Sequence, residues 1–262
     1  MILSHRVSLN GTQMDSLDDS IIIQSVEENT PKYTISGVNI GTAGQRMTQQ
    51  RRDTLDLVVK FAIRLRKDNM AARDLVFDKI VKWALPGGTL MLNTKTNKCL
   101  NVVCVSPPGQ MDPRKWDTEY QITFRAFGVP YWEQVTPSTQ TVTASSGTYT
   151  LANNGTANSP LEVQFKNTGS ATINLVTVRS GGRTIRLESL GLAAGETFKL
   201  YYQNGLQKLT ITNAAGTTER SVMAKRTDTS ADDIWLAPGN NSIAFTASAS
   251  GALTLSCRGR FA

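Results

Sequence analysis

The chain has 262 residues, of which 40% are hydrophobic and 19% are charged. This composition excludes a disordered chain, and no stretch reaches the roughly 18 apolar residues of a membrane span. The first residues, MILSHRVSLN, lack the apolar core of a signal peptide, so we expect synthesis and folding in a cytoplasm without membrane insertion. The formal charge is +7, and the sequence contains no block of five or six basic residues. Such a pattern favours a solvated surface over a dedicated nucleic-acid site.

The first half begins with extended segments. Ile21–Val26 and Lys32–Ile40 are predicted as strands separated by a turn at Pro31. The polar stretch GTAGQRMTQQRRD, residues 41–53, is expected to be a loop. Residues 55–65 are predicted as one long strand, because every second residue is apolar: Leu55, Leu57, Val59, Phe61, Ile63 and Leu65. The other face is mostly polar: Asp56, Val58, Lys60, Ala62 and Arg64.

The spacing of apolar residues changes to that of a helix between Met70 and Leu85. Its predicted apolar side is Ala72, Leu75, Val76, Ile80, Trp83 and Ala84, and its charged side is Arg73, Asp74, Asp78 and Lys82. A strand pair, 90–93 and 100–105, and a last strand, Tyr120–Phe127, complete this half. One helix among about six strands predicts an α+β domain, a small split β-barrel with the helix packed against it.

The character of the chain changes across Ile122–Glu133, ITFRAFGVPYWE. A strand closed by Pro and two aromatics, followed by a sequence rich in Thr, Ser, Gly and Asn, predicts a domain boundary, with domains at 1–134 and 135–262. Pro130 is expected to end strand pairing because it has no N–H. Tyr131 and Trp132 are expected to wedge between the two domains.

The second half has the pattern of an all-β sandwich. Short strands are separated by Gly-rich and Asn-rich turns every 8–12 residues. Gly181-Gly182 and Asn204-Gly205 have the residues that two-residue hairpin turns need. Thr136–Asn158 is poor in apolar residues and is expected to be partly linker.

The residues for catalysis or metal binding are scarce. His5 is the single histidine, and Cys99, Cys104 and Cys257 are too few and too scattered for a zinc site. Neighbouring carboxylates such as Asp18-Asp19 and Asp232-Asp233 point in opposite directions on an extended chain and make poor acid/base partners. The sequence therefore predicts neither an enzyme nor a metal or cofactor site.

The aromatics of the second half leave carbohydrate binding open as an alternative, because the CH faces of sugars pack on aromatic rings. Tyr201 and Tyr202 are adjacent, so one of them faces outward if the strand is regular. Trp235 lies where a loop is expected to enter a strand. These three residues form a possible sugar platform, although most aromatics of this half fit a strand core.

Several segments, in this order, resemble the distal tail (Dit) proteins of long-tailed, non-contractile bacteriophages and prophages. They are ISGVNIGTAGQRMTQQRRDTLDLVVKFAIR, the helix AARDLVFDKIVKWA, the Pro130-Tyr131-Trp132 ending, LAAGETFKLYYQNG and IWLAPGNNSIAF. Together they cover nearly the full chain. One departure is that this family often has an Asp early in the strand after Gly-Glu, where this chain has Phe198-Lys199-Leu200.

The resemblance implies a structural virion protein at the phage tail tip, assembled in the host cytoplasm. Such proteins form rings, usually hexameric, that join the tail tube protein to the baseplate hub and receptor-binding proteins, and DNA passes through the ring. The first domain is then the ring-forming domain, and the second is a peripheral galectin-like or carbohydrate-module-like sandwich. The polar face of the long strand and its flanks supply candidates for the ring lumen or subunit contacts: Arg51, Arg52, Lys60, Arg64 and Arg66.

Two rival functions remain at this stage. A carbohydrate-binding adhesin would use the second half to recognise host surface glycans. A tail-associated hydrolase would need a compact group of carboxylates, and only seven acidic residues serve residues 135–262.

Overall fold

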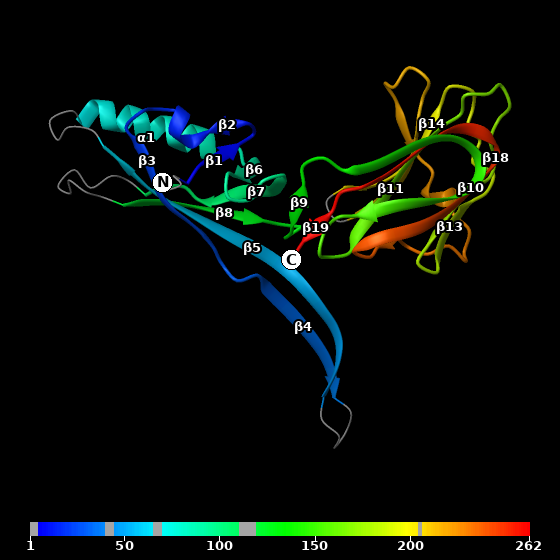
Figure 1. The fold of residues 1–262 in the computed structure, drawn as a ribbon, viewed down its shortest axis with the longest axis horizontal. Helices are drawn as coiled ribbons and strands as arrows, with labels where there is room; N and C mark the ends of the chain where they lie inside the picture. The colour runs from blue at the N-terminus through cyan, green and yellow to red at the C-terminus, as the bar shows by residue number, and fades with distance from the viewer. Residues whose placement is uncertain (1–4, 40–44, 65–69, 110–118, 204–205) are drawn as a thin grey trace. The chain divides into compact units, whose positions relative to one another are not determined.

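The computed structural model describes residues 5–39, 45–64, 70–109, 119–203 and 206–262 (Figure 1). The chain divides into two compact units, Met1–Trp132 and Glu133–Ala262. Each unit is built around its own buried apolar side chains. Among the described helices, none is both long enough and apolar enough to cross a bilayer.

The first unit is a sheet with one covering helix. Its strands are β1 (Val7–Leu9), β2 (Thr12–Gln13), β3 (Ile21–Glu28), β4 (Lys32–Asn39), β5 (Gln45–Ile63), β6 (Gly88–Leu92), β7 (Lys98–Ser106) and β8 (Tyr120–Ala126), with a short 3-10 turn at Met14–Ser16. Neighbours in the sheet follow the order β2-β1-β6-β7-β8-β5-β3, and β4 pairs with β5. The next strand, β9 (Trp132–Gln134), carries the boundary between the units.

The helix α1 (Met70–Ala84) packs on the apolar face of β5 and β8. Antiparallel pairing places Leu57 opposite Phe124 and Phe61 opposite Tyr120, so that these side chains share one face. The Trp83 ring of α1 meets the Phe124 ring edge-on, with centroids 6.0 Å apart. The alternation in β5 is confirmed, since Leu55, Leu57, Val59, Phe61 and Ile63 are all buried. Leu65 lies outside the described residues.

The predicted face of the helix is partly wrong. Leu75, assigned to the apolar side, is 65% exposed, whereas Arg73, assigned to the charged side, is only 2% exposed. The buried line of α1 runs through Arg73, Val76, Ile80 and Ala84, which are three or four residues apart. A long arginine stem can pack like an apolar side chain, and the buried side of α1 includes Arg73 and leaves out Leu75.

The polar stretch before the long strand is also a strand in its described part. Residues 45–53 were expected to be a loop, but β5 begins at Gln45 and pairs with β4 from Asn39↔Gln45 to Lys32↔Thr54. Backbone pairing with β4 satisfies the peptide groups of this segment. The resulting β4–β5 arm projects beyond the other strands of the unit (Figure 1).

The second unit is a β-sandwich. Its strands are β10 (Ser138–Asn153), β11 (Ser159–Lys166), β12 (Val176–Ser180), β13 (Arg183–Leu187), β14 (Thr197–Gln203), β15 (Leu206–Thr212), β16 (Glu219–Ser221), β17 (Trp235–Leu236), β18 (Gly239–Cys257) and β19 (Arg260–Phe261), with a 3-10 turn at Met223–Lys225. The strand order is β13-β12-β18-β11-β14-β15-β16, with β10 on β18 and β17 on β11.

One long strand forms the corner between the two layers of the sandwich. The first part of β18, Ile243–Ala247, pairs with β12, and the last part, Ala252–Cys257, pairs with β11. Between them, a Cβ on Gly251 would lie 2.4 Å from the Lys166 carbonyl oxygen, so the bend requires glycine. The rings of Phe165 on β11 and Phe245 on β18 then meet in the core, with centroids 4.8 Å apart.

Turn chemistry fixes the register of this unit. Gly181 and Gly182 have φ of +56° and +77° between β12 and β13, as a two-residue hairpin turn of this type requires. Asn204-Gly205 lies outside the described residues, and its flanking residues Gln203 and Leu206 are paired. The partial linker expected at Thr136–Asn158 is largely the strand β10, which pairs with β18 over its whole length.

Two buried asparagines close loops in the same way. The Asn153 amide donates to the carbonyl oxygens of Ala157 and Leu236, at 2.9 Å each, and its oxygen accepts from the Gly155 N–H. Asn167 makes the same three bonds with Ala171, Leu192 and Gly169. Each asparagine therefore satisfies backbone groups that the sheet leaves unpaired.

Candidate functional site

The β4–β5 arm exposes an apolar face. Cross-strand pairing of Tyr33 with Arg52, Ile35 with Gln50, and Gly37 with Met47 places Tyr33, Ile35 and Met47 on one side of the ribbon. These three side chains are 49%, 64% and 59% exposed. Within the described residues, the arm portion of β5 pairs only with β4, and β4 pairs only with β5. The arm therefore presents two open strand edges and an apolar face, features that favour pairing with another chain.

The basic residues predicted for the lumen or subunit contacts have different environments. Arg52 is 7% exposed, and its guanidinium lies 4.6 Å from the centre of the Tyr131 ring. The Lys60 ammonium is 2.6 Å from the Glu27 carboxylate, a bond that raises the pKa of Lys60. Arg64 is exposed just beyond β5. Arg66 and the side chain of Arg51 lie outside what the structure describes.

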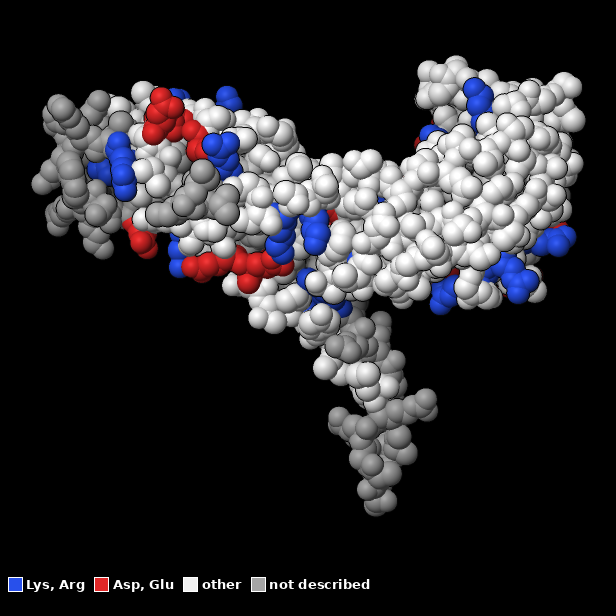
Figure 2. Space-filling model, viewed as in Figure 1, with Lys and Arg blue, Asp and Glu red and all other residues white. Residues whose placement is uncertain are grey.

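The polar face of β5 is held by ion pairs. Arg125 on β8 donates to both carboxylate oxygens of Asp56, from Nε at 2.5 Å and from Nη2 at 2.8 Å. These hydrogen bonds hold the pKa of Asp56 below its usual value. Because Lys60 is paired with Glu27 in the same way, the face carries opposite charges side by side. Figure 2 shows acidic and basic side chains interspersed over the described surface of this unit.

The residues at the end of the first unit are held by that unit. Pro130 is buried and Trp132 is 2% exposed. The Trp132 indole N–H donates to Glu28 Oε1 at 2.9 Å, and the Lys95 ammonium lies 4.6 Å from the centre of the Trp132 ring. Tyr131 is half-buried beneath Arg52. The placement of these rings between the domains stays a prediction.

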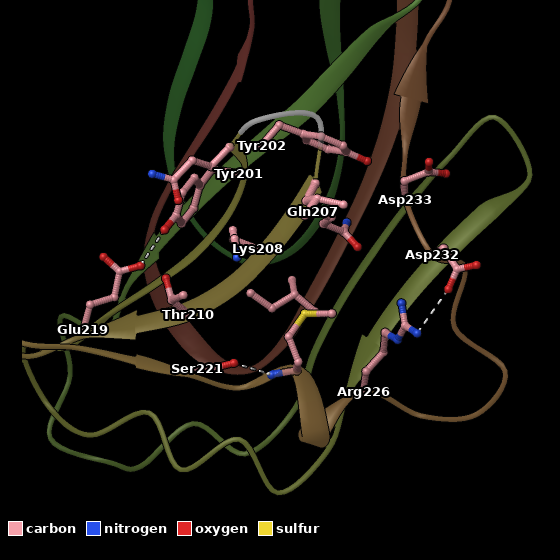
Figure 3. Close-up of a pocket in the computed structure, with 14 residues that line it drawn as sticks. Tyr201, Tyr202, Gln207, Lys208, Thr210, Glu219, Ser221, Arg226, Asp232 and Asp233 are labelled. Atoms are coloured by element: carbon pink, nitrogen blue, oxygen red, sulfur yellow. Dashed lines mark hydrogen bonds and ion pairs between the residues drawn. The ribbon is translucent and has the colours of Figure 1, made fainter. Parts of the chain in front are cut away.

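The second unit contains a cavity of about 730 Å³ beside the β14–β15 hairpin (Figure 3). Strands β14 to β16 and the segment from Met223 to Asp233 line it: Tyr201, Tyr202, Gln203, Leu206, Gln207, Lys208, Leu209, Thr210, Glu219, Ser221, Met223, Arg226, Asp232 and Asp233. Two of the three predicted platform residues, Tyr201 and Tyr202, are among these. The Trp235 ring instead packs against Tyr202, with centroids 5.4 Å apart, and the Arg260 guanidinium lies 5.2 Å from the centre of the Trp235 ring.

Most charged groups of the cavity have a hydrogen-bond or ion-pair partner. The Tyr201 hydroxyl donates to Glu219 Oε1 at 2.8 Å, and Arg226 lies 3.1 Å from Asp232. Asp233 pairs with Arg183 and accepts from the Trp235 indole N–H at 2.6 Å. Acidic and basic residues therefore give the lining no strong net charge.

Several polar atoms of the cavity lack protein partners. In the described part of the chain, no hydrogen bond satisfies the buried Tyr202 hydroxyl or the buried oxygen and nitrogen of the Gln207 amide. The Thr210 hydroxyl instead lies beside Glu219 and helps to lower the pKa of that carboxylate. Tyr202 and Gln207 face each other across β14 and β15. Burial raises the pKa of Tyr202, so its hydroxyl keeps its proton.

Gln207 and Thr210 were not singled out from the sequence, although a signal for Gln207 was present. An Asn-Gly turn at 204–205 makes Gln203 and Leu206 the first pair of the hairpin and Tyr202 and Gln207 the second. The apolar face of the arm was missed because its segment was expected to be a loop.

Among the described residues, no group of three or more His, Cys, Asp or Glu side chains could hold a metal ion.

Comparison with solved structures shows which fold this chain has. The SPP1 Dit (gp 19.1) protein superposes on this chain with a TM-score of 0.67 and 12% identity, over 97% of this chain and 98% of its own length. That protein is described as a paradigm of the hub adsorption apparatus in phages infecting Gram-positive bacteria. The chain has the fold of a distal tail protein. A chain of the phage P2 baseplate in its activated conformation with Ca covers 99% of this chain, at a TM-score of 0.50 and 9% identity.

The distal-tail fold agrees with the predicted class, an α+β domain followed by a β-sandwich. No protein-family model and no curated sequence matches the chain. At 12% identity the likeness concerns the fold, so the contacts described above must carry any statement about assembly or ligands.

Proposed function

We propose that this protein is a structural component of a phage tail tip, where copies of the chain assemble into a ring.

 

The ring would join the tail tube to the baseplate hub. The observation that carries this proposal is the fold shared with the SPP1 Dit protein over nearly the whole of both chains. The family resemblance of the sequence points the same way, and it implies a non-catalytic role in the virion.

The β4–β5 arm supports assembly into an oligomer. A two-stranded ribbon in water is marginally stable by itself, and this ribbon exposes Tyr33, Ile35 and Met47 on one side. Contact with a neighbouring copy would cover these side chains and pair the open edges. Because each copy offers the same arm, a head-to-tail contact can close into a ring.

The finer parts of the proposal follow from the family resemblance. They are six copies per ring, partners in the tail tube, the baseplate hub and the receptor-binding proteins, and passage of DNA through the ring. The first domain would form the ring, and the second would lie at its periphery. Lys60 and Arg64 keep exposed surface in the single chain, so they are the basic residues that we place at the lumen or at subunit contacts.

Negative-stain electron microscopy of the purified full chain tests the proposal. We expect closed rings with six-fold symmetry, and multi-angle light scattering should give the mass of six chains. A monomer at every protein concentration, both alone and mixed with the tail tube protein of the same phage, would overturn the proposed assembly.

A further inference from the structure

The strand β10 forms an open edge of the sandwich. It pairs with β18 from Ser138↔Cys257 to Asn153↔Gly239, and within the described residues it pairs with no other strand. The two parts of β18 pair with β12 and β11 on their other side, so β10 is the edge of both layers. Alternate residues of an edge strand turn their N–H and C=O groups away from the sheet. β10 therefore offers backbone donors and acceptors to another chain along its sixteen residues.

The other edges of this sandwich are protected. Along β13, the Thr227 N–H donates to the Arg186 carbonyl oxygen at 3.0 Å, and the Ala231 N–H donates to the Thr184 carbonyl oxygen at 2.7 Å. The segment that contains Thr227 and Ala231 thus covers that edge. At the far end of the strand order, β16 has three residues, two of which are charged. Covering segments, short strands and charges are the usual means by which an edge is kept from pairing with other chains.

β10 has few of these protections. Its sixteen residues include no charged residue and no proline. A bulge between Ala144 and Ser146 divides it into the runs 138–144 and 146–153, and the Tyr149 hydroxyl lies 3.5 Å from the Ser146 carbonyl oxygen. Each run is as long as an ordinary strand. Either run can therefore accept a whole strand from outside the sandwich.

The exposed side chains of β10 suit an uncharged strand. They include Thr139, Thr141 and Thr143 before the bulge and Thr148 and Thr150 after it. β-branched side chains pack well on a pleated surface, and threonine pairs across neighbouring strands are favourable. A partner strand with uncharged, β-branched side chains therefore fits this edge better than a charged strand does.

The symmetry of a ring decides between a second copy and another protein. Pairing β10 with the β10 of a second copy joins the same edge twice, so a two-fold axis must relate the two copies. Neighbours in the proposed ring are instead related by rotation about the ring axis, which leaves each β10 edge open. We propose that β10 receives an extended, uncharged strand, as long as one of its two runs, from another protein of the tail tip. This inference rests on the proposed function, which supplies the ring.

Amide hydrogen exchange, read by mass spectrometry, tests the edge in the assembled protein. The purified ring is compared with intact tail tips of the same phage. In the ring, about half of the amides of β10 should exchange at least about tenfold faster than those of β11, which has a strand on each side. In tail tips these fast amides should slow by about tenfold or more. Equal exchange of β10 in rings and tail tips would overturn the proposal, whereas absence of the chain from the tail tips would overturn the proposed function itself.

A synthetic strand tests the edge without the partner. The probe is the acetylated and amidated peptide STQTVTA, the sequence of residues 138–144, which is uncharged. The control peptide carries N-methyl groups on two adjacent residues, which removes one N–H from each of its edges. At about 1 mM, a concentration that detects weak binding, the first peptide should slow exchange in β10 and the control should not. An equal effect of both peptides, or none from either, would mean that the edge does not pair and would overturn the proposal.

Added charge locates the pairing. Thr143→Lys and Thr150→Lys each place a cation on an exposed position of β10, and Thr246→Lys does so on β18, which has β10 and β12 on its two sides. Each β10 variant should weaken peptide binding about two- to fivefold, the effect of one unfavourable cross-strand pair, and Thr246→Lys should not. All three variants should still form rings. Rings lost in the β10 variants and kept in Thr246→Lys would assign the edge to a neighbouring copy and overturn the assignment to another protein.

Discussion

Of the two ion pairs described on the polar face of β5, the pair between Asp56 and Arg125 has the larger number of hydrogen bonds. The Asp56 side chain is 10% exposed and accepts two bonds from one guanidinium. Hydrogen bonds to charged groups contribute about 1.5–3 kcal/mol. We therefore expect Asp56→Asn to lower the free energy of unfolding by about that amount at pH 7, as measured by urea denaturation.

The pH dependence of this difference follows from the pKa of Asp56. The pair with Arg125 holds that pKa below its unfolded value, so the stabilisation is fully present above about pH 4 and is lost as the pH falls through the folded-state pKa. The gap between the native protein and Asp56→Asn should close at low pH. Glu27→Gln breaks the more exposed pair with Lys60 and should change stability little. An equal loss in both variants would contradict the special role of Asp56.

Two buried arginines show what the sequence alone does not predict. Arg52 and Arg73 are cations that a pattern assigns to the surface, yet they are 7% and 2% exposed. Arg52 is buried against Tyr131, a residue far along the chain. Because the guanidinium stacks on a ring that only the fold brings near, no local spacing indicates this contact.

At the scale of elements, the arm should matter for assembly and not for the fold of the single chain. Ile35 and Met47 are mostly exposed on the apolar face of the ribbon. We expect the double variant Ile35→Ser, Met47→Ser to lose the oligomer in light scattering, because the covered apolar area is removed. Its melting temperature as a monomer should change little, since surface substitutions usually shift stability by less than about 0.5 kcal/mol.

Lys32→Ser serves as the control, because it removes an exposed polar side chain from the same strand. This variant should keep the oligomer. If the double variant still assembles at the native concentration, the arm does not carry the subunit contact, and another surface must be sought.

Elements with a buried face could be predicted, and those without one could not. The alternation of Leu55 to Ile63 predicted the second part of β5 because one side of that strand faces the core. The first part of β5 lies in the arm and is held by backbone pairing with β4, which does not require an apolar residue at every second position. Strand β10 is a second example, because it lies at the edge of the sandwich and its residues 138–143 are mostly polar.

At the scale of the whole chain, the predicted class was correct, because its signals are distributed over many residues. One helical period among alternating segments indicated the α+β domain, and regularly spaced turns indicated the sandwich. The cavity was not predicted as a site, although two of its tyrosines were candidates. It depends on β14, β15 and the segment up to Asp233 meeting in space, and only the hairpin register was available locally.

The two units should respond separately to loss of core packing. Phe124 and Phe165 are fully buried in the first and second unit, and replacing a buried phenylalanine by alanine costs about 3–5 kcal/mol. We expect Phe124→Ala to raise amide hydrogen exchange in residues of the first unit and Phe165→Ala to raise it in the second. The milder Phe165→Leu should give the same pattern with a smaller increase. Raised exchange throughout both units in either variant would mean that the chain unfolds as one cooperative block.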